Sequence, residues 1–207
     1  MTYLACCSFP LLVEGRRSVS LVTAWFSGPV PLFLPGFLLW TLVSVALSSR
    51  AARALDTSRP VALLLLVSLG FGLSATLSPT GEAFAGEALA GGTCDLRQLG
   101  LPPLSQLTRP NDVVLNIILF VPMGIALGLL PRSRRTMVVI AAAFTVPLVI
   151  ETLQLVLVDL GRGCESADVI NNMLGVAVGI GIAVAARLVH AWLTPDNGPT
   201  DSTSQAG

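Results

Sequence analysis

The sequence predicts an all-α fold, a polytopic membrane helix bundle with about five transmembrane helices. Of its 207 residues, 53% are hydrophobic and only 12% are charged, whereas a soluble domain carries about a quarter charged residues. A bilayer core about 30 Å thick requires about 20 predominantly apolar residues in each spanning helix. Segments that meet this requirement lie near Val30–Ser48, Val61–Ser78, Val113–Leu130, Thr136–Leu160 and Asp168–Leu193.

The remaining parts of the chain are organised around these spans. Glutamate and arginine interrupt the apolar stretch that opens the sequence, so this stretch is expected to be a tail. The last residues are polar and rich in proline, glycine and serine, a composition typical of disorder. The predicted parts are an N-terminal tail (1–29), two transmembrane helices (30–78), an extracytoplasmic loop (79–110), a core of three transmembrane helices (111–193) and a disordered cytoplasmic tail (194–207).

The distribution of arginine predicts the orientation of the bundle. All twelve basic residues are arginine, and short cytoplasmic loops of membrane proteins carry an excess of basic residues. The loops after the first and third spans contain Arg50, Arg53, Arg59, Arg132, Arg134 and Arg135. We therefore expect both loops to be cytoplasmic, with the N-terminus outside and the C-terminus in the cytoplasm.

A carboxylate lies in the middle of the fourth apolar span, in the run VPLVIETLQLVLVDL. Burying Glu151 there costs several kcal/mol unless it is partnered or protonated, and such residues usually mark function. On the predicted topology, the third and fifth spans bring further polar side chains to the same outer half of the membrane. The expected partners of Glu151 are Asn116, Asn172 and Arg162. The predicted functional cluster consists of Asn116, Glu151, Gln154, Arg162, Asp168 and Asn172.

Some of these polar residues also have a purely structural interpretation. Asparagine and glutamine in membrane helices often form hydrogen bonds between helices, each contributing about 0.6 to 2 kcal/mol. Asp168 follows Ser166 and could cap the start of a helix. This interpretation stays open for Asn116, Asn171 and Gln154, whereas the position of Glu151 favours a functional site.

Glycines on the third and fifth spans predict close packing between them. Small residues four positions apart allow the backbones of two membrane helices to approach closely. The third span contains Gly124 and Gly128, and the fifth contains Gly175 and Gly179. We therefore expect these two faces to pack against each other around the polar cluster.

Two of the four cysteines are expected to form a disulfide. Cys94 in the long outer loop and Cys164 in the short outer loop both face the oxidising side, where disulfides persist. A Cys94–Cys164 bridge would hold the long loop over the polar cluster, whereas Cys6 and Cys7 are expected to be free thiols.

Three stretches of the core occur in an order and spacing found in a known family: NDVVLNIILFVPMGIALGLL, LVIETLQLVL and GRGCESADVINNMLGVAVG. They lie within residues 111–181 and resemble the VanZ family, with a weaker echo in ATLSPTG at the end of the second span. The insertion-like GRGCES differs from the shorter arginine-containing turn of many relatives, so the placement of Arg162 stays open. The resemblance implies as signature positions Asn116, Phe120, Pro122, Gly124, Glu151, Gln154, Arg162, Asp168, Asn172 and Gly175.

The resemblance also implies a location and a role. VanZ-like proteins are small bacterial membrane proteins, so the expected location is the bacterial inner membrane, which the chain crosses several times. The founding member lowers susceptibility to the glycopeptide antibiotic teicoplanin, and no catalytic activity is agreed for the family. We therefore expect a non-catalytic protein whose outward-facing polar site affects cell-envelope chemistry or glycopeptide susceptibility.

Two other functions are weighed against this one. A membrane hydrolase or transferase could act on a lipid-linked substrate with Glu151 and Asp168. A small transporter could use the carboxylate of Glu151 to carry protons. The chain has no lysine, and its single histidine, His190, is far from the cluster in the predicted topology. These absences weaken the case for an enzyme.

The sequence also restricts the ligands and partners. The oxygen-bearing residues of the cluster match no established metal motif, so neither a metal site nor a cofactor is expected. No basic patch with interleaved aromatic residues occurs, which argues against nucleic acid. The expected partners are the lipid bilayer and a lipid-linked cell-wall precursor or a glycopeptide.

Overall fold

Five long helices form the body of the molecule. The computed structural model describes residues 30–84, 86, 92–108 and 111–194. Each long helix in this part of the chain is long and apolar enough to cross a membrane, which confirms the predicted fold class. The predicted tails, 1–29 and all but the first residue of 194–207, lie outside the described residues. The long helices are α2 (Phe33–Ala54), α3 (Arg59–Leu77), α5 (Asp112–Leu129), α6 (Arg134–Val156) and α7 (Ser166–Leu193).

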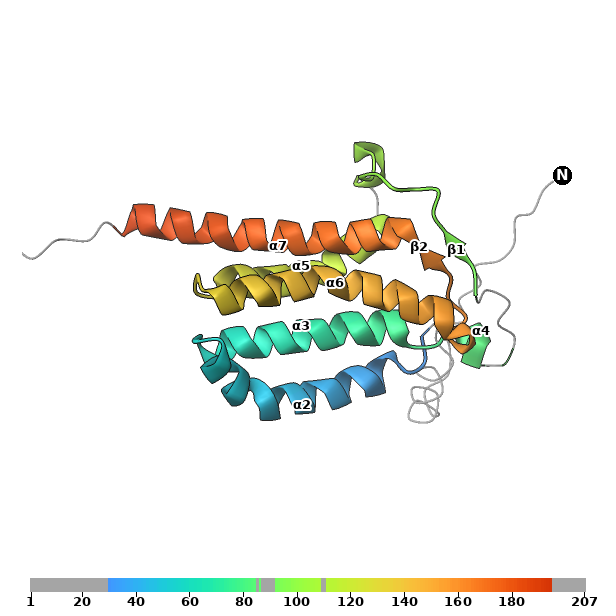
Figure 1. Cartoon of the computed structure of the whole chain (residues 1–207), viewed down its shortest axis with the longest axis horizontal. Coiled ribbons are helices and arrows are strands. Elements are labelled where there is room, and N and C mark those ends of the chain that lie inside the picture. Colours follow the sequence, from blue (N-terminus) through green and yellow to red (C-terminus); the bar gives the residue numbers. More distant parts are fainter. Residues whose placement is uncertain (1–29, 85, 87–91, 109–110, 195–207) are drawn as a thin grey trace, which may run out of the picture.

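The five helices run side by side, so that the bundle has two chemically distinct ends (Figure 1). At one end, α3 and α6 finish and α5 and α7 begin. We call it the disulfide end, because its connections contain the paired strands described below. The opposite end carries the turns between α2 and α3 and between α5 and α6, and we call it the arginine end. Only Arg132 lies in one of these turns, whereas the other arginines expected in loops, Arg50, Arg53, Arg59, Arg134 and Arg135, lie in the helix ends beside the turns. The short elements are α4 (Gly81–Phe84), β1 (Cys94–Asp95), the 3-10 turns Leu104–Gln106 and Val158–Leu160, and β2 (Cys164–Glu165).

Side-chain caps define where two of the helices begin. The side chain of Asn111 accepts a hydrogen bond from the N–H of Val114 at the start of α5. Ser133 does the same for the N–H of Thr136 at the start of α6. Each cap satisfies one of the four backbone N–H groups that have no partner inside a helix.

Two helix ends differ from the prediction. The helix α2 continues past the predicted end at Ser48 to Ala54. Ser48 therefore lies inside the helix, where its hydroxyl donates to the carbonyl of Val45. The helix α6 stops at Val156 rather than Leu160, and a 3-10 turn follows it and ends at Gly161 with a left-handed φ of 64°. Residues 157–160 therefore belong to the predicted span but lie outside the α-helix.

The closest contact between helices joins α5 and α7 through glycine. A Cβ added to Gly179 would fall inside contact distance of backbone atoms of α5, including those of Val121 and Gly124. A Cβ on Gly175 would collide with the carbonyl of Ile117, and one on Gly128 would lie 2.7 Å from the Cβ of Ala183. Hydrogen at these positions is therefore what allows the two backbones to meet.

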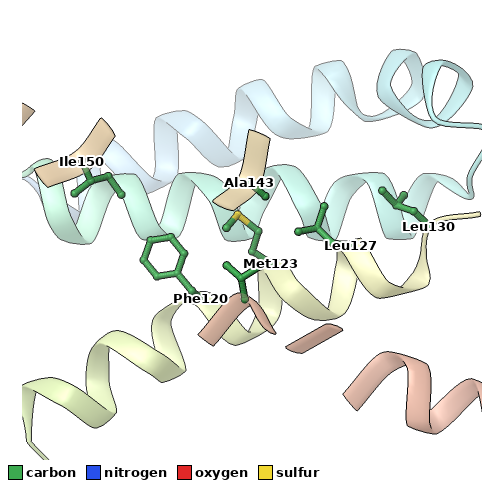
Figure 2. Packing of buried hydrophobic residues seen from close by; sticks show 7 residues of the cluster. Phe120, Met123, Leu127, Leu130, Ala143 and Ile150 are labelled. Atoms are coloured by element: carbon green, nitrogen blue, oxygen red, sulfur yellow. The ribbon is translucent and has the colours of Figure 1, made fainter. Parts of the chain in front are cut away.

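A buried apolar cluster lies between α5, α6 and α7. Phe120, Met123 and Leu127 follow one another along α5, and Leu130 comes directly after its end. Figure 2 shows Ala143 and Ile150 of α6 beside them. Val176 of α7 completes the cluster, and each of these side chains is at most 7% exposed. Because lipid tails are as apolar as leucine, this cluster holds the helices together by close packing rather than by exclusion of water.

Candidate functional site

The candidate site lies at the disulfide end, where four helix termini meet. The starts of α5 and α7 supply Asn116, Asp168 and Asn172, and the last turns of α6 supply Glu151 and Gln154. The loop between α6 and α7 supplies Arg162. All six predicted cluster residues therefore lie at the same end of the bundle, but they bond to different groups.

Glu151 is buried in the bundle. Its side chain is 4% exposed, and its Oε2 accepts a hydrogen bond of 2.8 Å from the backbone N–H of Glu165. Among the described residues, none of the expected partners, Asn116, Asn172 and Arg162, forms a hydrogen bond with it. The donor is instead a main-chain group of β2, which passes close to α6 and was not predicted from the sequence.

The disulfide positions this donor. Cys94 and Cys164 are bonded, with their Cα atoms 4.4 Å apart, in agreement with the sequence prediction. The two strands pair in parallel, with Cys94 opposite Cys164 and Asp95 opposite Glu165. The N–H of Cys164 also donates to the carbonyl of Thr93 at 3.2 Å. The N–H of Glu165 that reaches Glu151 thus belongs to a strand that the disulfide and the pairing both hold.

Asp168 joins the starts of α5 and α7. Its Oδ1 accepts a hydrogen bond of 2.6 Å from Nδ2 of Asn116. The carboxylate lies in the first turn of α7, where the positive end of the helix dipole favours negative charge. The first residue of α7, Ser166, donates to the carbonyl of Gln98 at 2.7 Å and ties the long loop to the helix. Asp168 is therefore fixed by a side chain from another helix.

Gln154 and Arg162 both bond to the end of α3. Gln154 donates through Nε2 to the carbonyl of Thr76 at 2.8 Å. Arg162 donates through Nη2 to the carbonyl of Ala75 and through Nε to that of Ser78, both at 3.1 Å. These carbonyls lie at the C-terminus of α3, where a helix has no further N–H groups to offer. Both side chains thus cap α3, and the three carbonyls that accept from them lie within the stretch ATLSPTG.

Arg162 also contributes charge to the site. Burial lowers the pKa of its guanidinium, while the carboxylates of Asp168 and Glu151 act in the opposite direction. Within the described residues it forms no ion pair with either carboxylate at 4 Å or less. Because an arginine side chain stays protonated in proteins, Arg162 acts on them as a nearby positive charge rather than as a direct partner.

Asn172 is the least satisfied member of the cluster. Its side chain is 1% exposed, and its Oδ1 has no hydrogen-bond partner among the described residues. A buried acceptor without a partner costs about 1–3 kcal/mol, so such atoms call for an explanation in function or in a bound molecule. Asn171, its neighbour in the sequence, is also buried at 3% exposure.

A small polar cavity adjoins β2. It has a volume of about 100 Å³ and is lined by Asp95, Arg97, Gln98, Glu165 and Ala167. Hydrogen bonds from Arg97 lower the pKa of the Asp95 carboxyl to about 2, so that both side chains are charged at neutral pH. The cavity thus brings charged groups beside the strand that binds Glu151.

The arrangement offers limited chemistry for a metal ion. In the described part of the chain, no three histidine, cysteine, aspartate or glutamate side chains gather closely enough to hold a metal. The predicted cluster itself offers the carboxyl groups of Glu151 and Asp168, the guanidinium of Arg162 and three side-chain amides, which can bind a polar group by hydrogen bonds.

Comparison with known proteins identifies the family. No curated protein and no protein of known structure matches the chain. The family model described as VanZ/LLP1 matches residues 32–189 of the 207 residues, a region that includes all five long helices almost completely. The chain therefore belongs to the VanZ/LLP1 family and is a membrane protein.

Proposed function

We propose that the polar cluster at the disulfide end is a non-catalytic, outward-facing binding site. Through it, the protein would affect cell-envelope chemistry or the access of glycopeptide antibiotics to cell-wall precursors. The observation that carries this proposal is the buried carboxylate of Glu151, which has a single backbone N–H as its hydrogen-bond partner. A carboxylate can accept about four hydrogen bonds, so Glu151 retains capacity for a ligand.

The unpartnered oxygen of Asn172 supports the same proposal. It shares this end of the bundle with Glu151, and a hydrogen-bond donor from a ligand would satisfy it. A lipid-linked cell-wall precursor or a glycopeptide carries many hydroxyl and amide donors. Neither Gln154 nor Arg162 is needed for this role, because both are already bonded to α3.

Two features support the outward orientation of the cluster. The arginines in and beside the short turns lie at the opposite end, which is the distribution expected of a cytoplasmic side. The disulfide lies at the end that carries the cluster, and disulfides persist on the oxidising side of the membrane.

The substitution Glu151→Gln tests the proposal. Glutamine keeps an oxygen that can accept the hydrogen bond from the N–H of Glu165, so the variant should fold normally. It replaces the ionisable carboxyl group with an amide, however, so cells that produce it should show the antibiotic susceptibility of cells without the protein. The measurement is a susceptibility profile with glycopeptides and other envelope-directed antibiotics, made with equal amounts of protein in the membrane.

Glu165→Gln provides the matched control. Glu165 is exposed and contributes its backbone rather than its carboxylate to the bond with Glu151. Cells that produce this variant should therefore keep the susceptibility profile of cells with the unchanged protein. If Glu151→Gln retained the full phenotype, Glu151 would be a packing residue and the proposal would fail. Turnover of a lipid-linked substrate that vanished in Glu151→Gln would instead support a hydrolase or transferase.

A further inference from the structure

A large cavity opens at the arginine end of the bundle, far along the helices from the polar cluster. Its volume is about 730 Å³, within the range of about 300–1,000 Å³ typical of small-molecule sites. The end of α5, the start of α6 and the C-terminal half of α7 enclose it. Its wall is mainly apolar and includes Met137, Ile140, Ile180, Val184 and Leu188.

The charged residues that line this cavity are all arginines. They are Arg132, Arg134 and Arg187, and no aspartate or glutamate is among the lining residues. Arg187 is held in place because its Nη1 donates to the carbonyls of Gly128 and Leu130 at the end of α5, each at 3.3 Å. The cavity thus combines an apolar wall with a cluster of positive charge.

These three arginines also lack acidic neighbours. All three are exposed, and among the described residues none has a carboxylate within 4 Å. Arg135, next to Arg134 in the sequence, lies instead 3.8 Å from the carboxylate of Asp56. The positive charge at the cavity is therefore available to an anion from outside the chain.

The apolar wall extends inward from the arginines on two helices. Ile140 follows Arg134 by six residues on α6, and Ile180 precedes Arg187 by seven on α7. At about 1.5 Å per residue these separations correspond to about 9 and 10 Å. Because α6 and α7 run in opposite directions (Figure 1), both apolar walls extend from the arginines toward the middle of the bundle.

We propose that this cavity binds an anionic phospholipid of the adjacent leaflet. The phosphate would lie at Arg132, Arg134 and Arg187, and an acyl chain would lie along the apolar wall. A guanidinium binds phosphate through two parallel N–H groups, and basic pockets between transmembrane helices are suited to acidic headgroups. A zwitterionic lipid would fill the apolar part but would leave the arginines without net negative charge. The lipid site is independent of the function proposed for the disulfide end.

Lipid retention by the purified full chain tests this proposal. The protein in an uncharged maltoside detergent is titrated with dioleoyl phosphatidylglycerol or dioleoyl phosphatidylcholine. Native mass spectrometry measures the bound lipid, and the midpoint of thermal unfolding is recorded in parallel. We expect retained phosphatidylglycerol and a higher midpoint, with much weaker retention and a smaller rise from phosphatidylcholine at the same concentration.

A triple substitution removes the positive charge at the cavity. Arg132→Gln, Arg134→Gln and Arg187→Gln together should weaken the retention of phosphatidylglycerol by about a hundredfold. The matched control removes the same number of charges at the same end, through Arg50→Gln, Arg53→Gln and Arg135→Gln, and should leave retention unchanged. Equal losses in the two triple variants would show general attraction to surface charge and would overturn the site.

A second variant tests the acyl-chain part without removing charge. Val184 lines the cavity and is 37% exposed, so Val184→Trp can fill the space without disturbing the core. It should reduce retention of phosphatidylglycerol although all three arginines remain. Unchanged retention in this variant would overturn the acyl-chain placement. Equal retention of the two lipids, an equal rise in midpoint with inorganic phosphate, or a lipid-free dimer in the mass spectrum would also overturn the proposal.

Discussion

Single residues of the predicted cluster separate into two groups by their hydrogen bonds. Gln154 and Arg162 donate to carbonyls at the end of α3, and these bonds account for their burial. Glu151 accepts one backbone N–H, and Oδ1 of Asn172 accepts none among the described residues. The first group has a structural explanation, whereas the second retains unused hydrogen-bonding capacity. This difference predicts that substitutions in the two groups will have different effects.

Gln154→Met should lower stability rather than act at the binding site. Methionine has a similar length but no N–H, so the buried carbonyl of Thr76 would lose its donor. We expect a loss of about 1–3 kcal/mol in the free energy of unfolding, seen as a lower midpoint of thermal unfolding in detergent. The matched control is Thr152→Val, two residues earlier on α6. It removes an exposed hydroxyl and should have little effect on the midpoint. An unchanged midpoint in Gln154→Met would contradict the capping role.

The sequence could identify these residues but not their partners. A carboxylate or an amide within an apolar run is visible directly, so Glu151 and Gln154 were predicted members of the cluster. Their partners are main-chain groups, which every residue possesses and which leave no mark in the sequence. The bond between Gln154 and Thr76 also joins residues 78 positions apart, and the bonds of Arg162 span 84 and 87.

Among the described helices, α5 and α7 have the most extensive contact with each other. Glycine at four positions brings their backbones into contact, and the polar bond between Asn116 and Asp168 lies at one end of the same interface. The cavity at the arginine end lies at the other end of this interface, and Gly128 belongs to both. Close packing of α5 on α7 therefore supports both the polar cluster and the proposed lipid site.

Gly179→Ala should weaken this helix pair. The added methyl group would meet backbone atoms of Gly124 and Ile125, which cannot move aside as a flexible side chain can, so the helices must separate. We expect a cost of about 1–3 kcal/mol, measured as a lower unfolding midpoint in detergent. Gly181→Ala is the matched control in the same helix, because no atom lies within 4 Å of its added Cβ. It should be neutral or stabilising by up to about 1 kcal/mol, and equal losses in the two variants would contradict the packing argument.

The elements themselves could be predicted better than their ends. Apolar runs of spanning length identify all five long helices, because the bilayer imposes the same length on each. Their ends depend on local bonds that hydropathy does not record, such as the hydroxyl bond of Ser48 inside α2 or the 3-10 turn after Val156. The short strands β1 and β2 were not predicted, since two residues carry no periodic pattern.

For the whole molecule, the two ends of the bundle carry different chemistry. The disulfide end gathers the carboxylates and amides beneath a covalently linked pair of strands. At the arginine end, positively charged side chains surround the mainly apolar cavity. An orientation with the disulfide end outside matches both the compartment in which disulfides persist and the side on which basic residues accumulate. The disulfide therefore serves as a test of the orientation of the whole chain.

Thiol labelling of intact cells should show this orientation. In a Cys6→Ser, Cys7→Ser background, we expect Cys94 and Cys164 to resist a membrane-impermeant alkylating reagent until an impermeant reductant is added from outside. Mass spectrometry identifies the labelled peptides. Arg53→Cys, placed at the arginine end of α2, is the matched control and should stay unlabelled in intact cells but react after lysis.

Loss of the disulfide should also affect the site, because Cys164 directly precedes Glu165, whose N–H binds Glu151. The double substitution Cys94→Ser, Cys164→Ser should lower the free energy of unfolding by about 2–4 kcal/mol. It should also reduce the effect of the protein on antibiotic susceptibility. Labelling of both cysteines without reductant would rule out the disulfide. Labelling of Arg53→Cys in intact cells, with protection of the other two until lysis, would reverse the orientation and place the cluster on the cytoplasmic side.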